Sequence, residues 1–328
     1  MPVQGGAPAG RGVDEEEGHP GAAVVAALEL ERFVLVAQAA EGKDLHARTI
    51  SNDAAVLADV VPLLRCPVCE GDLALSDGAL RCDAGHSFDV ARQGYVNLVP
   101  GSADTAAMVE ARDEFLRTGQ FDRLTRALVL QAGGFDAPGA VVDLGAGTGH
   151  YLSRTLDALP RNAGIAIDSS PAALRRAARS HERAAAVGAD VWKPLPLKDD
   201  VAALVLSVFA PRNPAEIARI LAPGGYLVAA TPTTRHLYEL VGPLGLLSVP
   251  DDKEDRLDAQ LASRFELVSR DAIEYALFLS RDEATQLVRM GPSAWHVDDQ
   301  AVSEGIERLP DPLTATASVT LSRYRGAA

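Results

Sequence analysis

The sequence predicts an α/β protein built on a doubly wound, largely parallel β-sheet, with a small metal-stabilised unit ahead of it. Two observations lead to this fold class. An apolar strand at residues 141–144 runs directly into a glycine-rich loop and then a helix, which is how a doubly wound sheet begins. Upstream, all three cysteines and one histidine have the paired spacing of a zinc site. We therefore expect one main domain and one metal-bound satellite.

The composition limits the number of domains and the class of partner. A chain of 328 residues with 47% hydrophobic content can bury one large core and a small appended unit. No uncharged apolar run reaches about 18 residues and no secretory signal is evident, so we expect a cytoplasmic protein with no membrane partner. A reducing compartment keeps the cysteines available for metal. The net charge of −14 argues against a broad basic face for nucleic acid, so any RNA partner must be held locally.

Residues 1–58 differ in composition from the rest of the chain. The stretch 5–21 is rich in Gly, Pro and acidic residues and is expected to be disordered. Residues 22–40 are apolar but interrupted by charges, which favours a weak helix or strand over a membrane span. We expect a partly disordered extension without chemistry of its own. One hypothesis is that translation begins nearer Val56 or Val60.

A zinc ribbon is predicted for residues 59–103. The four ligands form a C-x2-C-x12-C-x3-H array and are Cys66, Cys69, Cys82 and His86. Each pair can hold the metal through a tight knuckle, and four protein ligands make a closed structural site rather than a catalytic one. Between the pairs, leucines alternate with polar residues around Asp77-Gly78, which predicts a short β-hairpin. The alternative, three reduced thiols beside a surface histidine, does not account for the paired spacing.

Residues 104–134 are predicted to form a helical connector. Apolar residues recur at helical spacing on one face of each of two helices, and they are Met108, Ala111, Phe115 and Leu116, followed by Leu124, Leu128 and Val129. We expect these helices to dock the ribbon onto the main domain.

The main domain, residues 135–328, begins with a candidate cofactor loop. Asp143 precedes Gly145, Gly147 and Gly149, and the following strand ends at Asp168. In a doubly wound sheet, glycines let the backbone approach a cofactor while a carboxylate at the second strand accepts hydrogen bonds from ribose hydroxyls. The D-x-G-x-G-x-G pattern differs from that of dinucleotide binders and suits S-adenosylmethionine. Asp143 can bind the charged amino-acid end of that cofactor directly or indirectly.

The remaining elements complete one sheet. Further strands are expected at residues 201–209, 223–231, 265–279 and 315–324, with helices at 214–221 and 281–290. This order follows the seven-strand plan of Rossmann-like methyltransferases. The densest basic run, residues 174–183, is interpreted as the solvated face of a helix.

The chain resembles the RlmA type of 23S rRNA guanine-N1 methyltransferases, a family that includes macrolide-resistance enzymes. The resemblance covers roughly residues 64–325. Its most specific motifs are Cys66-Pro-Val-Cys69, His86 to Leu98, Met108 to Leu116, Phe209-Ala-Pro211, Ala230 to Leu237 and Met290 to Trp295. The resemblance implies a class I methyltransferase that uses S-adenosylmethionine and structural zinc and methylates N1 of a guanine in a 23S rRNA hairpin loop. Macrolide resistance and a homodimer are further expectations.

Individual site residues follow from the resemblance by position. The four residues of the ribbon array match the family's zinc ligands. The loop through Gly149, His150 and Tyr151 matches its cofactor loop, and His236 matches a histidine at the cofactor. Phe121 stands where some members place a tyrosine that contacts the cofactor, so here the ring is kept and the hydroxyl is lost.

The chemistry required leaves the catalytic residue open. Guanine N1 faces its partner in a duplex, so the target must lie in a loop or be flipped out. Transfer is an in-line displacement that depends mostly on positioning. Asp190, Asp143 and His236 are candidates for the base that removes the N1 proton, but cofactor binding explains each equally well, and none is assigned. Phe209 is expected to pack against the guanine or the methyl donor, with a core role as the alternative.

Two functions of other classes stay open. A small-molecule methyltransferase would share the sheet and the loop but would have no need of a zinc ribbon. A non-catalytic ribosome-binding factor would have a vestigial cofactor site, against which the intact loop and Asp168 argue.

Overall fold

The computed structural model of the chain describes residues 53–99, 101, 104–134, 137–250, 252–291 and 298–327. The expectations for residues 5–21 and 22–40 lie outside these ranges. Among the described residues, no helix is long and apolar enough to cross a membrane.

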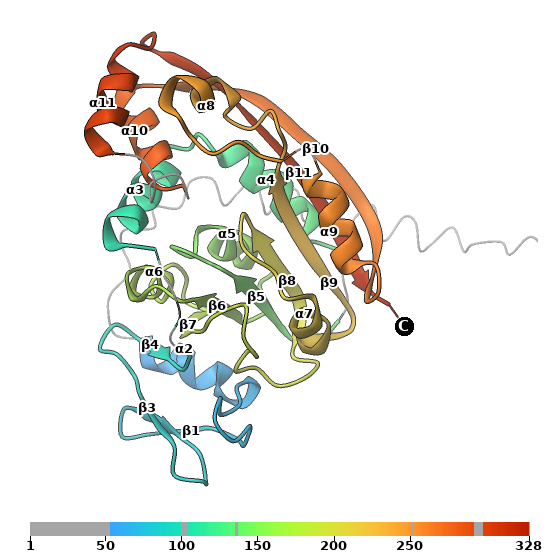
Figure 1. The fold of residues 1–328 in the computed structure, drawn as a ribbon. Helices are drawn as coiled ribbons and strands as arrows, with labels where there is room; N and C mark the ends of the chain where they lie inside the picture. The colour runs from blue at the N-terminus through green and yellow to red at the C-terminus, as the bar shows by residue number, and fades with distance from the viewer. Residues whose placement is uncertain are drawn as a thin grey trace, which may run out of the picture.

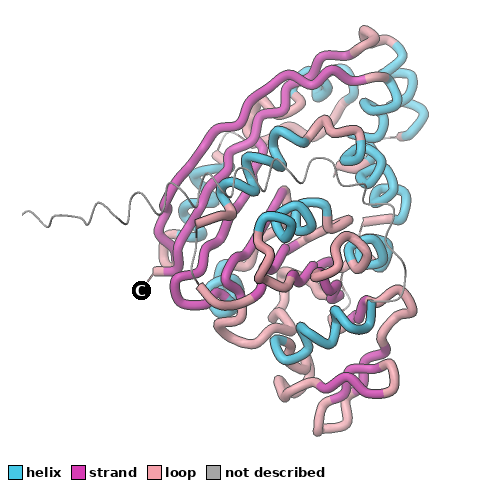
Figure 2. The backbone as a smooth tube through the Cα atoms, turned by 180° about the vertical axis from the view of Figure 1, so that it is seen from behind, coloured by secondary structure: helices cyan, strands magenta, loops and turns pink. Residues whose placement is uncertain are grey.

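The main body is an eight-stranded sheet in the order β10-β11-β9-β8-β5-β6-β7-β4 (Figure 1). The strands are β4 (Tyr95–Asn97), β5 (Ala140–Leu144), β6 (Gly164–Asp168), β7 (Ala184–Gly188), β8 (Ala202–Val208), β9 (Leu221–Pro232), β10 (Phe265–Leu279) and β11 (Leu313–Gly326). Pairing is parallel from β4 to β9, and β11 runs antiparallel to both of its neighbours. Seen from behind, β10 and β11 lie side by side as the two longest strands (Figure 2).

Helices cover both faces of this sheet. They are α2 (Asp53–Val60), the short 3-10 helix η3 (Val61–Leu63), α3 (Ala106–Arg117), α4 (Asp122–Gln131), α5 (His150–Ala158), α6 (Pro171–Ala177), α7 (Pro214–Ile220), α8 (Tyr238–Leu244), α9 (Lys253–Leu261), α10 (Arg281–Arg289) and α11 (Asp299–Glu307). Successive strand residues point to opposite faces. Val141 therefore packs in the cluster with α4, α5 and α6, whereas Val142 packs in the cluster with α2, α7 and α9.

The predicted α/β class and the order of its elements are confirmed, with two differences. The sheet has eight strands instead of seven, because β4 adds to its edge beside β7. Strand β7 itself was not singled out from the sequence. It reads Ala-Ala-Ala-Val-Gly, and alanine and glycine are poor strand formers, so only burial between β6 and β4 makes this segment a strand.

The ribbon forms a separate three-stranded sheet of β1 (Ala74–Ser76), β2 (Ala79–Arg81) and β3 (Ser87–Asp89). The predicted hairpin is confirmed. Ser76 pairs with Ala79 across a two-residue turn, and both turn residues, Asp77 and Gly78, have positive φ angles of 50° and 73°. This geometry matches the right-handed twist of the two strands.

The ribbon joins the main body through its own chain rather than through the helical connector. Strand β4 pairs with β7, Leu64 bridges to Leu197, and the Lys198 ammonium lies 2.7 Å from the Asp72 carboxylate. Helix α3 instead packs against α10 and α6, and α4 against α5 and β11 (Figure 1). The expected docking role of these helices is therefore wrong.

Two boundaries also differ from the expectation. Helix α2 spans the expected end of the extension at residue 58, and Leu57 within it is fully buried in the core. The basic run at 174–183 is helical only as far as Ala177. Arg183 follows the helix and donates hydrogen bonds to the carbonyls of Leu156, Leu159 and Asn162, so it closes the end of α5 instead of facing solvent.

Candidate functional site

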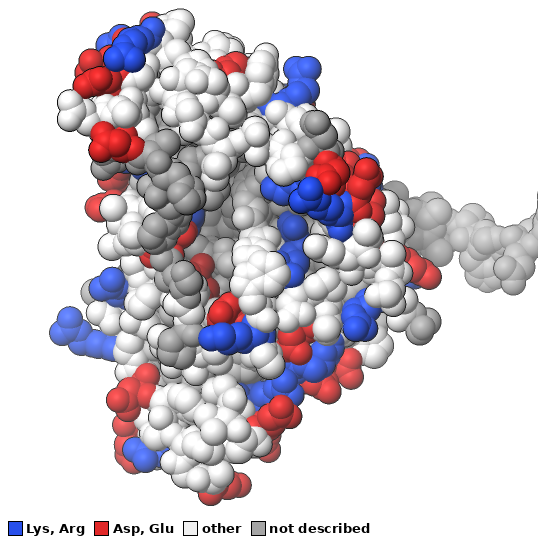
Figure 3. All heavy atoms as spheres, in the orientation of Figure 1, with Lys and Arg blue, Asp and Glu red and all other residues white. Residues whose placement is uncertain are grey.

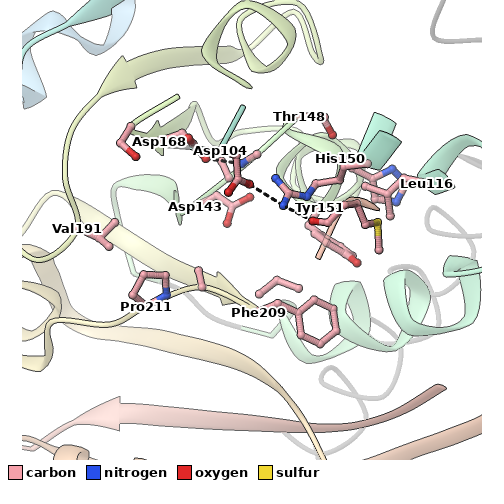
Figure 4. A pocket seen from close by; sticks show the side chains of 18 of the residues that line it. Asp104, Leu116, Asp143, Thr148, His150, Tyr151, Asp168, Val191, Phe209 and Pro211 are labelled. Atoms are coloured by element: carbon pink, nitrogen blue, oxygen red, sulfur yellow. Dashed lines mark hydrogen bonds and ion pairs between the residues drawn. The ribbon is translucent and has the colours of Figure 1, made fainter. Parts of the chain in front are cut away.

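A cavity of about 500 Å³ opens at the carboxyl ends of the central strands, where α/β sheets bind ligands. Its lining comes from α3, the glycine loop, and the segments that follow β6, β7 and β8. Figure 4 shows Asp104, Asp143 and Asp168 on one side of the cavity, and Phe209 and Pro211 opposite them. One wall is thus acidic and the other is apolar.

The glycine loop brings bare backbone to this cavity. Gly145, Gly147 and Gly149 all have positive φ, between 55° and 79°. A Cβ at Gly145 would lie 2.7 Å from the Cβ of Ala210, and one at Gly149 would lie 2.5 Å from a serine hydroxyl. Larger residues are therefore excluded at Gly145 and Gly149 by both conformation and space, and the loop brings bare backbone close to the cavity.

Asp143 is the most unusual polar group in the cavity. Its side chain is 1% exposed, and Oδ2 has no hydrogen-bond partner. Burial, followed by the nearby Asp168 carboxylate, raises its pKa to about 8, although the Leu152 N–H donates to it. A buried acceptor without a partner is unfavourable unless a ligand supplies one, and a cationic donor would suit it best.

Asp168 holds the loop in shape. One of its carboxylate oxygens accepts the Gly147 N–H and the other accepts the Ser170 N–H, each at 2.8 Å. Burial raises its pKa despite these hydrogen bonds. Each oxygen keeps a second lone pair, so Asp168 can still accept hydrogen bonds from a ligand in the cavity.

Arg112 was not identified as a site residue from the sequence, although it lies inside the Met108–Leu116 motif. Its guanidinium is 2.7 Å from the Asp104 carboxylate and donates to the Met290 carbonyl at 2.8 Å. It also lies 3.4 Å from the position that a Gly147 Cβ would occupy. A cation therefore stands directly over the glycine loop, where it can bind an anionic ligand group.

The segment after β7 closes another side of the cavity. Asp190, Val191 and Trp192 all line it, and Trp192 is 66% exposed. The Asp190 carboxylate accepts the Trp192 N–H at 3.0 Å. Asp190 was considered from the sequence only as a base. The other two were missed because β7, whose carboxyl end positions them, was not recognised as a strand.

Three aromatic rings gather beside the apolar wall. Phe209, at a positive φ of 54°, lines the cavity and is 40% exposed. The His236 ring stacks on it with centroids 5.6 Å apart, and Phe121 lies 6.4 Å from Phe209 and 6.3 Å from His236. Phe121 lines the cavity as expected, whereas His236 lies behind Phe209 and is not part of the lining.

The proton on His236 can be placed from its hydrogen bonds. The Ser318 N–H donates to Nδ1 at 3.2 Å, so in the neutral ring Nε2 carries the proton and is a donor. Burial, followed by the charge of Lys253, lowers the pKa of His236 to about 4. The neutral form therefore prevails near neutral pH.

His150 and Tyr151 both line the cavity at the start of α5. His150 Nε2 is 3.2 Å from the Thr125 hydroxyl, and burial, followed by the charge of Arg154, lowers its pKa to about 4. Burial raises the pKa of Tyr151 well above its usual range. Both rings are therefore neutral, and they pack edge to face at 5.1 Å.

The four predicted zinc ligands converge at one point. Their ligand atoms all lie within 4.8 Å of one another, with Cys69 Sγ 3.6 Å from Cys82 Sγ and His86 Nδ1 3.3 Å from Cys82 Sγ. Tetrahedral zinc with bonds of about 2.3 Å to sulfur places its ligands about 3.8 Å apart, close to these distances. Gly85, at a φ of 86°, closes the second knuckle by donating its N–H to the Cys82 carbonyl. The donor set and its geometry fit one structural zinc ion.

The chain is similar to several known proteins. Residues 64–104 match the family model of the RlmA N-terminal region, and residues 141–225 match a methyltransferase domain. The 23S rRNA (guanine(748)-N(1))-methyltransferase of Streptomyces fradiae is 49% identical over 81% of this chain and 98% of its own length. A Micromonospora griseorubida protein, provisionally named a 23S rRNA (guanine-N1)-methyltransferase, is 47% identical over the same shares. A geranyl diphosphate methyltransferase solved with S-adenosylmethionine covers 69% of this chain and 93% of its own, with 14% identity and a TM-score of 0.41.

Together the cavity and the ribbon define the cofactors. The methyltransferase match identifies S-adenosylmethionine, and the Asp143 carboxyl group, whose Oδ2 has no partner, and the bare glycine loop fit its cationic amino-acid end. The ribbon match and the converging ligands identify zinc. The chain belongs to the family of 23S rRNA (guanine-N1)-methyltransferases.

Proposed function

We propose that this enzyme methylates N1 of a guanine displayed in a hairpin loop of 23S rRNA. The observation that carries the proposal is one cavity with a buried carboxyl oxygen that lacks a partner on one wall and an exposed aromatic ring on the other. The first matches a cationic cofactor and the second a flat base. The names of the relatives supply the substrate class.

We assign the amino-acid end of the cofactor to the glycine loop. Asp143 would accept hydrogen bonds from its ammonium group, and Arg112 would bind its carboxylate, since both side chains line the cavity beside the glycine loop. Asp168 would accept hydrogen bonds from the ribose, as expected from its place at the end of β6. Asp190 and Val191, at the end of the next strand, would then face the adenine.

The rings at the start of α5 and α4 would shape the cofactor site without carrying charge. His150 and Tyr151 line it in neutral form, so they offer hydrogen bonds and apolar surface but no counter-charge for the cofactor. Phe121 is 2% exposed and would pack against the cofactor by its edge, which needs no hydroxyl group.

The base would enter along Phe209. S-adenosylmethionine carries its methyl group on a positively charged sulfur. A nitrogen nucleophile can attack the methyl carbon in line with the carbon–sulfur bond, and the sulfur leaves as a neutral thioether. Phe209 offers a ring face for stacking, and the rings of His236 and Phe121 hold it in place from behind. Catalysis would then consist mainly of placing N1 in line with the methyl group.

Removal of the N1 proton needs no dedicated base in this arrangement. His236 carries its proton on Nε2 and is therefore a donor, suited to stabilise negative charge on a base oxygen rather than to accept a proton. Asp143 lies under the glycine loop, where the proposed cofactor ammonium occupies it. Asp190 is bonded to the Trp192 N–H and faces Lys193 at 3.7 Å. We propose that the proton passes to water.

The zinc ribbon is proposed as the module that recognises the loop of the RNA. Its four metal ligands converge at one point, and it is joined to the main sheet at the strand next to the cavity. A small-molecule methyltransferase would have no need of this second module, whereas the intact glycine loop and Asp168 argue against a non-catalytic ribosome-binding factor. An enzyme that modifies rRNA works where ribosomes are made, so a cytoplasmic location follows from the proposed substrate.

Two measurements test the proposal. Calorimetry should show S-adenosylmethionine binding, and no binding heat at high protein concentration would favour the non-catalytic ribosome-binding factor. Primer extension on 23S rRNA should stop at one guanine in the wild-type strain and read through in the deletion strain, because N1 methylation blocks base pairing. A stop that persists in the deletion strain would refute the substrate. The same strains would show whether macrolide resistance depends on the gene, and sedimentation would test the predicted homodimer.

A further inference from the structure

Two basic side chains beside the apolar wall of the cavity have no acidic partner. Arg212 directly follows Pro211, which lines the cavity, and Lys253 is the first residue of α9. The charge of Arg212 lowers the pKa of Lys253, and the charge of Lys253 lowers the pKa of His236, so each lies within electrostatic range of the next. Among the described residues, neither cation takes part in an ion pair.

Three arginines between residues 235 and 270 are each paired with a carboxylate, Arg256 with Asp252 at 2.7 Å, Arg235 with Glu274 at 3.1 Å, and Arg270 with Asp258 at 2.6 Å. Arg212 instead donates only to backbone carbonyls, at 3.3 and 3.4 Å, and its Nε is buried without a partner.

Two partly buried like charges are unfavourable unless an anion joins them. Burial lowers the pKa of Arg212 to about 10, and burial followed by Arg212 lowers that of Lys253. Buried charges in proteins are usually paired with a charge of opposite sign or with a ligand. Arg212 and Lys253 have the same sign and repel each other. An anion between the two would be bound by both.

The position of this pair relates it to the base site. Arg212 is three residues beyond Phe209, and His236, which stacks on Phe209, lies within the electrostatic range of Lys253. In Figure 3, basic side chains lie along the side of the central hollow that faces α9. A nucleotide whose base stacks on Phe209 would bring its own sugar-phosphate to this side.

We propose that Arg212 and Lys253 form an anion site that binds a backbone phosphate of the nucleotide being methylated. The inference rests on the proposed RNA substrate. It explains how a chain with a net charge of −14 holds RNA, because two cations without acidic partners, beside the residues that line the pocket, would bind a phosphate locally. Arg212 and Lys253 would hold the target nucleotide in the position from which its base reaches the cavity.

The test uses the hairpin that the wild-type enzyme methylates, in unmodified form and with one neutral methylphosphonate on either side of the target guanosine. Lys253→Gln should weaken hairpin binding about tenfold at 0.1 M salt and flatten the salt dependence by about one phosphate. Arg212→Lys, which keeps the charge, should weaken binding less. The loss of affinity caused by Lys253→Gln should vanish on the hairpin in which the phosphate bound by Lys253 has been replaced by a neutral methylphosphonate.

Arg256→Gln is the matched control, because it removes the same charge from the same helix. An equal loss from this control would mean that only net charge matters and would overturn the site. The site would also be overturned if the loss of affinity from Lys253→Gln added to the loss from each of the two methylphosphonates. A third outcome against it would be weaker S-adenosylmethionine binding with unchanged RNA binding, since the cations would then hold the cofactor carboxylate. If the wild-type enzyme methylates no 23S rRNA hairpin, the proposed function itself fails and the inference with it.

Discussion

Asp143 should release a proton when the cofactor binds. In the free protein its pKa is about 8, so about nine tenths of the molecules carry a protonated carboxyl group at pH 7. A ligand ammonium group placed against the unpartnered Oδ2 favours the ionised carboxylate and returns the pKa towards its usual range. Binding at pH 7 should therefore release about 0.9 proton per site more in the wild type than in Asp143→Asn.

The same linkage predicts a pH-dependent affinity. Below pH 8 the wild type must first ionise Asp143 before it binds. Its apparent Kd is therefore larger than the Kd of the ionised form, by a factor of about 100 at pH 6 but only about 2 at pH 8. The amide of Asp143→Asn has no such step. The ratio of the variant Kd to the wild-type Kd should therefore rise about 50-fold between pH 6 and pH 8.

Titration calorimetry with S-adenosylhomocysteine measures both quantities, since this product has the same amino-acid end and cannot react. Proton release is obtained from buffers with different ionisation enthalpies. The ligand amino group titrates equally with both proteins, so it cancels in the comparison. Equal proton release from the wild type and Asp143→Asn, or a Kd ratio that is flat with pH, would refute the assignment of Asp143 to the ammonium group.

Three other predictions concern stability. Removing zinc with a chelator, or replacing Cys82 with serine, should lower the melting temperature and abolish RNA methylation, and unchanged melting would argue against a structural metal. Gly149→Ala combines a φ of 79° with a 2.5 Å contact and should cost at least about 2 kcal/mol by denaturant melting, whereas Gly224→Ala, at a φ of 80° but in open space, should cost about 1 kcal/mol. The pKa values of His150 and His236 are about 4, below the unfolded value of about 6.5, so the unfolded chain binds more protons between these pH values. Stability should therefore fall as pH drops from 6.5 to 4, and His236→Asn should weaken that slope.

The ribbon and the glycine loop were predictable because their geometry is local. Cys66 and Cys69 belong to one knuckle, and two knuckles of this kind can meet only around one metal, so the spacing alone anticipates the cluster. The glycine pattern likewise states where backbone must take positive φ. In both motifs, residues near in sequence create the constraint.

The parts that sequence reasoning missed depend on distant contacts. Arg112 faces the cavity because α3 packs against α10, 178 residues away at the Met290 carbonyl. Strand β7 exists because neighbours bury an alanine-rich segment that has little strand preference of its own. His236 was placed at the cofactor by its motif, but its partner on Ser318 comes from β11 and turns the ring into a donor. Such roles appear only once the elements are packed.

The join between ribbon and cavity bears on how RNA would be presented. Strand β4 ends the ribbon segment and pairs with β7 as far as Gly188, whose carbonyl accepts the N–H groups of both Leu98 and Val99. A Cβ at Gly188 would lie 2.3 Å from the Asn97 side chain, so the contact is tight. Asp190 stands two residues further on and lines the cavity. The ribbon and the cavity share this strand pair. If the ribbon holds the RNA loop as proposed, the loop would meet the cavity at a fixed distance, and methyl transfer to a base requires positioning of that kind.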